Sequence, residues 1–470
     1  GKFVRRHRLA TATAGIVFLG LLAGITGITL GLVRALRAEE IARQEVERAA
    51  RESETADRVV DFMVDLFQMP DPSQARGNTV TAREILDKGA ARISEGLDDE
   101  PEIQSRLMET MGRVYRSLGL FSSAQTLLEE SLQKRRQQLG DEHPEVATSL
   151  NILAQNLEAR GDYEAAVPLF EEALALRRKI YGDNHPEVAS TLSNLGTVLR
   201  SMGDPKGAIE LYRQALEVDE PARDRAGVQN NLALALQDIG ELDEAERIFR
   251  ETIETLIEGY GEDSPNVAIA RNNLGIVLHG QEDYAGAKEQ FSLAVELNRR
   301  VLGDQHPEYA NALANLGSTL EDMGELDAAE KNFRESLAIR REMLGNDHPN
   351  VGIDLSNLAG VVADQGDLEA ALLLYLESIG VMEVAVGPDH WFTAQIRSHY
   401  GRTLSKLGRR EAAERELLSG RRGLASALGD DHQRTLETTR ALVELYESWD
   451  KPTKAEEFRA LIEAQEGGDE

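Results

Sequence analysis

Apolar residues recur along most of the chain in paired helical segments that repeat about every 42 residues. The matching positions of two successive units are Leu153, Ala154, Leu157, Gly161, Ala166, Phe170 and Ala173, then Leu195, Gly196, Leu199, Gly203, Ala208, Tyr212 and Ala215. Spacings of three and four residues place apolar side chains on one face of a helix. Because a single helix hairpin cannot bury such a face alone, the repetition predicts an all-α solenoid of about nine hairpins over residues 102–462.

Proline and glycine bound each predicted hairpin. His-Pro-Glu-Val-Ala begins at His143 and again at His185, and His-Pro recurs at His306 and His348. Proline suits the first turn of a helix, and glycine, as at Gly161, suits its C-terminal end. We therefore expect each histidine to stabilise the start of a helix or to pack in the loop between repeats.

The pattern resembles the tetratricopeptide repeat, and the 42-residue period with Gly-Asp-x-His-Pro-Glu-Val-Ala resembles the kinesin-light-chain type. This resemblance implies a right-handed superhelical solenoid that binds other proteins. It weakens towards the C-terminus, where Arg409, Leu417 and Asp450 replace the usual acidic, aromatic and glycine residues. An atypical last repeat is typical of a unit that caps the array.

Residues 9–33 contain no charged side chain and are long enough to cross a bilayer as one helix. Basic residues are slightly more frequent on the N-terminal side, at residues 1–8, which predicts a cytoplasmic N-terminus and repeats on the other side of the membrane. A cleaved signal peptide is the alternative, but its apolar stretch would be shorter. One face of the predicted span carries small residues on which two copies can pack as a homodimer. These residues are Gly20, Gly24, Gly27 and Gly31.

Four further segments separate or end the predicted domains. Residues 34–69 predict a charged helical stalk, and residues 70–80, which contain Pro70 and Pro72, predict a linker. Residues 81–97 predict a capping helix that opens with the box from Thr81 to Glu84. Residues 463–470 predict a disordered acidic tail.

Composition and motifs exclude several classes of function. A formal net charge of −30 argues against nucleic-acid binding, which needs clustered Lys and Arg. It indicates an acidic surface that keeps a long helical array soluble, and the alternative is an acidic surface that selects basic partners. The absence of cysteine excludes disulfides and thiolate metal sites. Histidines on successive repeats would lie too far apart to share a zinc ion. No phosphate-binding glycine loop or kinase catalytic motif occurs, so we expect no catalysis and no cofactor in this chain.

Asparagines recur on the first helix of successive hairpins. They are Asn151, Asn194, Asn230, Asn231, Asn272, Asn273, Asn315 and Asn357. An amide both donates and accepts hydrogen bonds, so these residues predict a concave groove for a protein or extended peptide. The alternative is a structural ladder that pairs between repeats, and the two roles are compatible. The flanking positions provide no basic pair for a carboxylate clamp: Gln155, Thr197, Leu234, Ile276, Ser318 and Gly360.

The N-terminal part resembles the segment that follows the catalytic domain in bacterial membrane serine/threonine protein kinases with repeat ectodomains. The resemblance is carried by residues 2–8, 60–67, 71–84 and 113–119. It implies the sensor or scaffold region of a receptor-like kinase in a bacterial inner membrane, with the catalytic domain upstream of Gly1. The alternative is a membrane-bound scaffold that assembles envelope protein complexes without enzyme activity.

Overall fold

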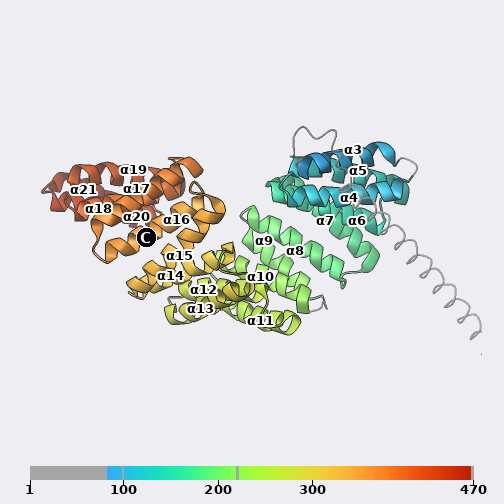
Figure 1. The fold of residues 1–470 in the computed structure, drawn as a ribbon, viewed down its shortest axis with the longest axis horizontal. Helices are drawn as coiled ribbons and strands as arrows, with labels where there is room; N and C mark the ends of the chain where they lie inside the picture. The colour runs from blue at the N-terminus through green and yellow to red at the C-terminus, as the bar shows by residue number, and fades with distance from the viewer. Residues whose placement is uncertain (1–81, 98–99, 219–221, 467–470) are drawn as a thin grey trace, which may run out of the picture. The chain divides into compact units, whose positions relative to one another are not determined.

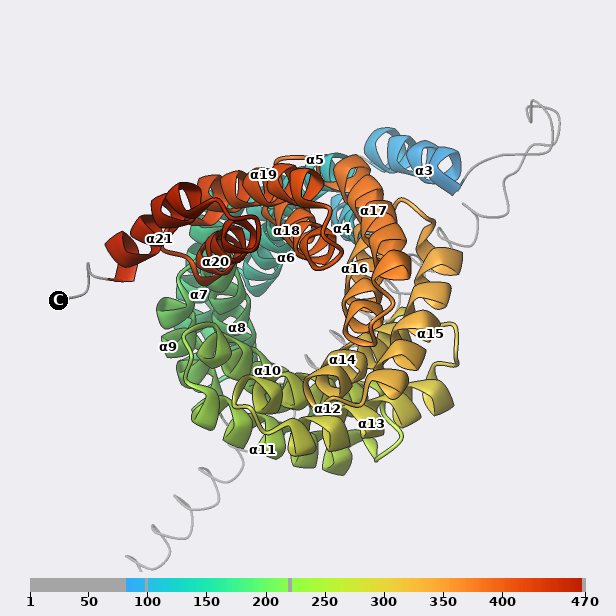
Figure 2. The same ribbon diagram turned by 90° about the vertical axis from the view of Figure 1, so that its left-hand side faces the viewer.

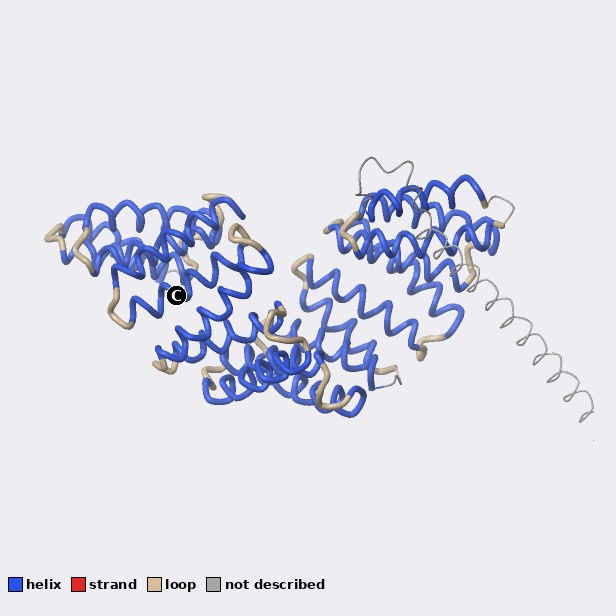
Figure 3. Tube along the Cα trace, viewed as in Figure 1, coloured by secondary structure: helices blue, strands red, loops and turns tan. Residues whose placement is uncertain are grey.

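The computed structural model describes residues 82–97, 100–218 and 222–466, and all regular structure in these ranges is α-helical (Figure 3). Contacts divide the chain into two compact units, residues 1–180 and 181–470. The described helices of the first unit are α3 (Ala82–Gly96), α4 (Pro101–Ser117), α5 (Phe121–Leu139), α6 (Pro144–Arg160) and α7 (Tyr163–Tyr181), whose last residue falls at the boundary. Helix α3 covers the predicted capping helix and packs on α4.

The second unit is itself an array of helix hairpins (Figure 1). Its helices are α8 (Pro186–Ser201), α9 (Pro205–Leu216), α10 (Ala222–Asp238), α11 (Leu242–Tyr260), α12 (Pro265–Gly280), α13 (Tyr284–Val301), α14 (Pro307–Asp322), α15 (Leu326–Leu344), α16 (Pro349–Asp364), α17 (Leu368–Ala385), α18 (Trp391–Lys406), α19 (Arg410–Leu428), α20 (Gln433–Ser448) and α21 (Pro452–Glu466). Consecutive helices pack together, and α21 extends four residues beyond the predicted end of the repeats. In Figure 2 the first helices α10, α12, α14 and α16 lie on the inner side of this unit, and α11, α13, α15 and α17 lie outside them.

Close packing within each hairpin depends on a small residue that faces an aromatic ring. A Cβ atom added at Gly275 would lie 2.7 Å from the ring of Phe291, and one added at Gly317 would lie 2.9 Å from Phe333. Both aromatic side chains are buried, with 2% and 0% of their surface exposed. The small residues therefore let the two helices cross closely.

Histidine caps the first helix of six described hairpins. The ring Nδ1 accepts a hydrogen bond from the backbone N–H two residues further on, at 3.2 Å in every case. The capping residues are His143, His185, His306, His348, His390 and His432. The hydroxyl of Ser264 takes the same role on α12 at 3.3 Å. The expected role of the histidines at helix starts is confirmed.

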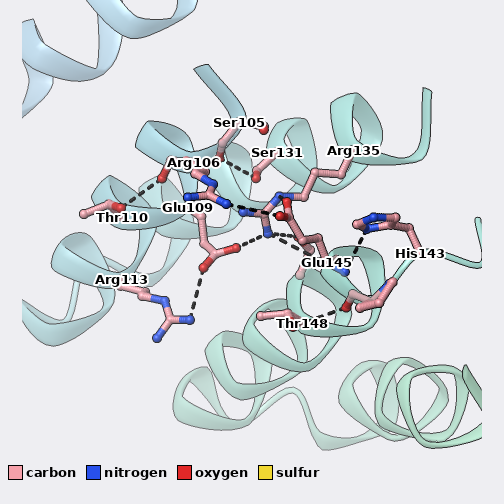
Figure 4. Close-up of polar contacts among 12 residues, drawn as sticks. Ser105, Arg106, Glu109, Thr110, Arg113, Ser131, Arg135, His143, Glu145 and Thr148 are labelled. Atoms are coloured by element: carbon pink, nitrogen blue, oxygen red, sulfur yellow. Dashed lines mark hydrogen bonds and ion pairs between the residues drawn. The ribbon is translucent and has the colours of Figure 1, made fainter. Parts of the chain in front are cut away.

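Buried arginines join consecutive hairpins. Arg135 of α5 is 5% exposed and donates a hydrogen bond to Ser149 Oγ on α6 at 2.6 Å. It also forms ion pairs with Glu109 of α4 and with Glu145 of α6 (Figure 4). Within the second unit, Arg340 of α15 forms the same kind of link to Asp354 of α16. These charges hold the second helix of one hairpin against the first helix of the next.

The prediction of a single-pass membrane protein is corrected here. Among the helices of residues 82–97, 100–218 and 222–466, none is long and apolar enough to cross a membrane. These helices have 12 to 19 residues and most carry a charged face, whereas a span needs about 20 predominantly apolar residues. The segment 9–33, with its four glycines, and the stalk and linker at 34–80 lie outside the described residues.

Candidate protein-binding surface

The inner face of the second unit is the surface formed by the exposed sides of α10, α12, α14 and α16 (Figure 2). Helix α12 packs against α11 and α13, and its edges contact α10 and α14. Its remaining side chains therefore point away from the outer helices, into the space that the first helices line. The same argument applies to α14, which lies between α12 and α16.

Asparagine side chains pair between neighbouring first helices on this face. Asn273 Nδ2 donates to Asn230 Oδ1 at 3.0 Å, and Asn315 Nδ2 donates to Asn272 Oδ1 at 2.9 Å. Each pair links hairpins that are one repeat apart, as a structural ladder would. Because each bond uses one donor or one acceptor, the Oδ1 atoms of Asn273 and Asn315 retain acceptor capacity for a further hydrogen bond. The amides are half-buried, so a ligand would reach them at the surface.

The other candidate asparagines are distributed differently. Asn151 lies on α6 in the first unit and is only 6% exposed. Asn194 lies on α8 and Asn357 on α16, and both are half-buried. Asn231 lies beside Asn230, and the Nδ2 atom of Asn230 is 3.5 Å from the Oδ1 atom of Asn231. The structure thus brings together the asparagines of α10, α12 and α14 but not all eight.

Helix α12 also exposes two isoleucines on the inner face. Ile269 is 38% exposed and Ile276 is 37% exposed. They are seven residues apart, two helical turns, so they share one side of α12 with Asn272 and Asn273 between them. Leu234 of α10 lies 42 residues before Ile276, at the equivalent position of the preceding repeat, and is half-buried. The face therefore combines amides with aliphatic contact area.

Carboxylates gather at the C-terminal ends of α14 and α16. Asp322 lies 2.8 Å from His279 Nε2, which comes one turn after Ile276. Glu321 is half-buried, and its Oε1 would be 3.2 Å from a Cβ atom added at Gly360. Burial, together with the negative charges of Asp364 and Asp322, raises the pKa of Glu321 to about 7. The carboxyl group is thus partly protonated near neutral pH.

The buried Tyr375 lies close to these carboxylates, and the half-buried His399 packs on it. The hydroxyl of Tyr375 would be 3.7 Å from a Cβ atom added at Gly360, and burial, with Glu321 and Asp364, raises the pKa of this tyrosine. His399 packs edge-on to Tyr375 with ring centroids 6.2 Å apart. Burial lowers the pKa of His399 to about 4, helped by the positive charge of Arg402. The histidine is therefore neutral at physiological pH.

The acidic part of this surface was not identified from the sequence. Asp322 and Asp364 are 42 residues apart, so their shared position in the repeat was a usable signal. The sequence pattern identified Ile276 only as a position without a basic residue. It did not identify Ile269, because the surface exposure of one isoleucine among many apolar residues has no sequence signature. Within the described ranges, no three His, Cys, Asp or Glu side chains lie where they could hold a metal ion.

Comparisons with known proteins identify the repeat. The family model described as tetratricopeptide repeat matches residues 103–179, 145–220, 224–297, 277–342 and 315–383, which together make up more than half of the chain. No match was found among curated proteins. Nothing in these comparisons supports the resemblance to the kinase-associated region.

Solved structures with a similar fold include BtubC (BKLC) from P. vanneervenii, at 21% identity over 47% of this chain and 90% of that chain, with a TM-score of 0.42. A putative kinesin light chain of Podosopora anserina matches at 22% identity over 42% of this chain and 97% of that chain, with a TM-score of 0.38. The apo form of RapI matches at 15% identity over 60% of this chain and 99% of that chain, with a TM-score of 0.48. At this level of similarity, none of them assigns a function to this chain.

Proposed function

Since the chain belongs to the tetratricopeptide repeat family, whose members bind protein or peptide partners, we propose that its inner face in the second unit binds an extended segment of a partner protein. The main chain of an extended segment presents N–H and C=O groups on alternate sides. Side-chain amides in a row can pair with both kinds of group.

The observation that carries this proposal is that the paired side-chain amides use only some of their hydrogen-bonding atoms on each other. The bonds from Asn273 to Asn230 and from Asn315 to Asn272 leave the Oδ1 atoms of Asn273 and Asn315 able to accept from backbone N–H groups. The two residues lie on adjacent first helices, next to the exposed side chain of Ile276. A binding surface with polar groups and aliphatic area in alternation favours a peptide over a small polar ligand.

A triple replacement of Asn231, Asn273 and Asn315 by Ala tests the proposal. We expect the full chain with this replacement to keep its helical circular dichroism and to lose capture of partner protein from cell extract. The matched control is Asn332→Ala on α15, where the amide donates to the carbonyl of Ala328 within its own helix at 2.8 Å. Equal capture by the triple variant and the control would contradict the proposal. Unfolding of the triple variant, with unchanged capture per folded molecule, would assign the asparagines a purely structural role.

A second candidate function is regulation of a serine/threonine protein kinase. It is favoured only by the sequence resemblance at residues 2–8, 60–67, 71–84 and 113–119. The test is the reading frame upstream of Gly1 in the gene. Kinase motifs that end shortly before Gly1 would support it, and an initiator codon a few residues upstream would exclude it.

A further inference from the structure

Helix α12 differs from the other first helices in the side chains that it presents to the inner face. At the position equivalent to Ile276, α8, α14 and α16 have the small residues Thr197, Ser318 and Gly360. At the same position α10 has the half-buried Leu234 and α18 has Arg402. Among the first helices that the structure describes in the second unit, only α12 has an exposed large apolar residue at this position and a second one at the position of Ile269. Exposed aliphatic area of this kind is typical of a contact surface.

The neighbouring ends of α14 and α16 concentrate negative charge. Helix α14 ends at Asp322 and α16 ends at Asp364, and neither has a basic residue in its last turn. By contrast, α8 has Arg200 and α18 has Lys406 in the last turn, and these charges offset the partial negative charge of a helix C-terminus. The carboxylates on α14 and α16 therefore add to the field of the helix ends instead of cancelling it.

The positive groups nearby do not neutralise these carboxylates. Among these acids His279 contacts only Asp322, and Lys406 Nζ is 4.0 Å from Asp364, an exposed pair of small energetic value. Arg402 of α18 acts on the neighbouring Tyr375, and no ion pair among the described residues joins it to these acids. The side-chain carboxyl of Glu321 accepts no hydrogen bond from the described part of the chain and lies against Gly360. A cationic group of a ligand would be attracted by all three acids.

The geometry points to a partner segment of defined chemistry, and this inference rests on the function proposed above. We propose that the inner face selects a segment in which an aliphatic residue is followed closely by Lys or Arg. The aliphatic side chain covers Ile269 and Ile276, and the cation lies among Glu321, Asp322 and Asp364. Charge complementarity identifies the occupant, because an acidic segment would meet the same field with the wrong sign.

An array of synthetic peptides probed with the full chain tests the inference. Each peptide places Leu or Ile one to four residues before Lys, Arg, Ser or Glu in a background of Gly, Ser and Asn. We expect Lys and Arg peptides to bind about tenfold more tightly than their Ser counterparts, and Glu peptides to bind least. Raising the salt concentration from 50 to 500 mM is expected to reduce this preference.

Two variants with the same change in net charge make the test specific. Glu321→Gln with Asp364→Asn is expected to abolish the preference for Lys over Ser. Glu289→Gln with Glu296→Gln, on the exposed face of α13, is expected to retain it. Ile276→Ser is expected to reduce binding of all aliphatic peptides alike.

The outcomes separate this inference from the proposed function. Peptide binding that is lost in the triple asparagine variant but is independent of the charge of the peptide would overturn the inference and leave the proposed function standing. Capture of partner that is unaffected by the triple asparagine variant would overturn both. A preference for Lys that survives in the Glu321 and Asp364 variant would place the cation elsewhere and also overturn the inference.

Discussion

Removal of Asp354 is expected to destabilise the middle of the second unit severely. The carboxylate is 0% exposed and forms an ion pair with Arg340, which is 8% exposed. Its second oxygen accepts a hydrogen bond from Ser336 Oγ at 2.7 Å. The Asp354→Ala replacement leaves the guanidinium group buried with only the side chain of Asn311 and the carbonyl of Asn350 as acceptors.

The magnitude follows from the cost of an uncompensated buried charge. Breaking a buried ion pair by removal of one partner typically costs about 3–5 kcal/mol. The Asn311 acceptor, at 2.7 Å from Arg340 Nη2, offsets part of this cost, so we expect about 3 kcal/mol. Because each hairpin contacts mainly its neighbours, the loss should be concentrated in α14–α17.

The next hairpin provides a matched apolar replacement. Met382 and Ile396 occupy the positions 42 residues after Arg340 and Asp354, and they are 2% and 0% exposed. The double replacement Arg340→Met with Asp354→Ile is therefore expected to recover most of the stability that Asp354→Ala loses. Exchange of a buried ion pair for apolar residues of similar size is often neutral.

Urea unfolding followed by circular dichroism would measure the two changes, and hydrogen exchange would locate them. The single variant should shift the unfolding midpoint and raise exchange in α14–α17, and the double variant should do neither strongly. A loss below about 1 kcal/mol in Asp354→Ala would contradict the assigned cost of the buried guanidinium. If the double variant is as unstable as the single one, the ion pair itself stabilises this position, and an apolar pair of similar size cannot replace it.

Three further replacements have clear expectations. The pKa of Glu321, about 7, lies above the value of 4.5 in the unfolded chain, so its contribution to the free energy of unfolding is full below pH 4.5 and falls as the pH rises towards 7. Glu321→Gln should remove this pH dependence and raise the free energy of unfolding by about 1–2 kcal/mol at pH 8. Urea unfolding at several pH values would measure both, and an unchanged pH dependence would contradict the expectation. Gly275→Leu should cost about 3 kcal/mol or more, because even a Cβ would lie 2.7 Å from Phe291; thermal melting that shows no loss would contradict the close crossing. Leu373 is 71% exposed, and the equivalent position one repeat earlier is Lys331. Leu373→Lys should therefore change the free energy of unfolding by less than about 0.5 kcal/mol. A larger loss in thermal melting would show that Leu373 has an unrecognised partner.

The repeat architecture was predictable because its determinants are local. Proline, histidine and glycine act within a few residues of a helix end, so the hairpin boundaries at His143 and Gly161 can be inferred without knowledge of the fold. The alternation of small and aromatic residues, as at Gly275 and Phe291, also repeats at fixed sequence offsets. The sequence alone therefore determined the helix type, the hairpins and the repeat family.

Only the tertiary structure decided which side chains meet between hairpins. The pairs of Asn273 with Asn230 and of Asn315 with Asn272 join residues 43 positions apart, and their contact depends on how one hairpin stacks on the next. The same stacking buries Arg340 against Asp354 and sets Glu321 against Gly360, where burial raises its pKa to about 7. Hydrogen bonds and desolvation act over a few ångströms in space, so neither can be inferred from positions along the chain before the packing of the repeats is known.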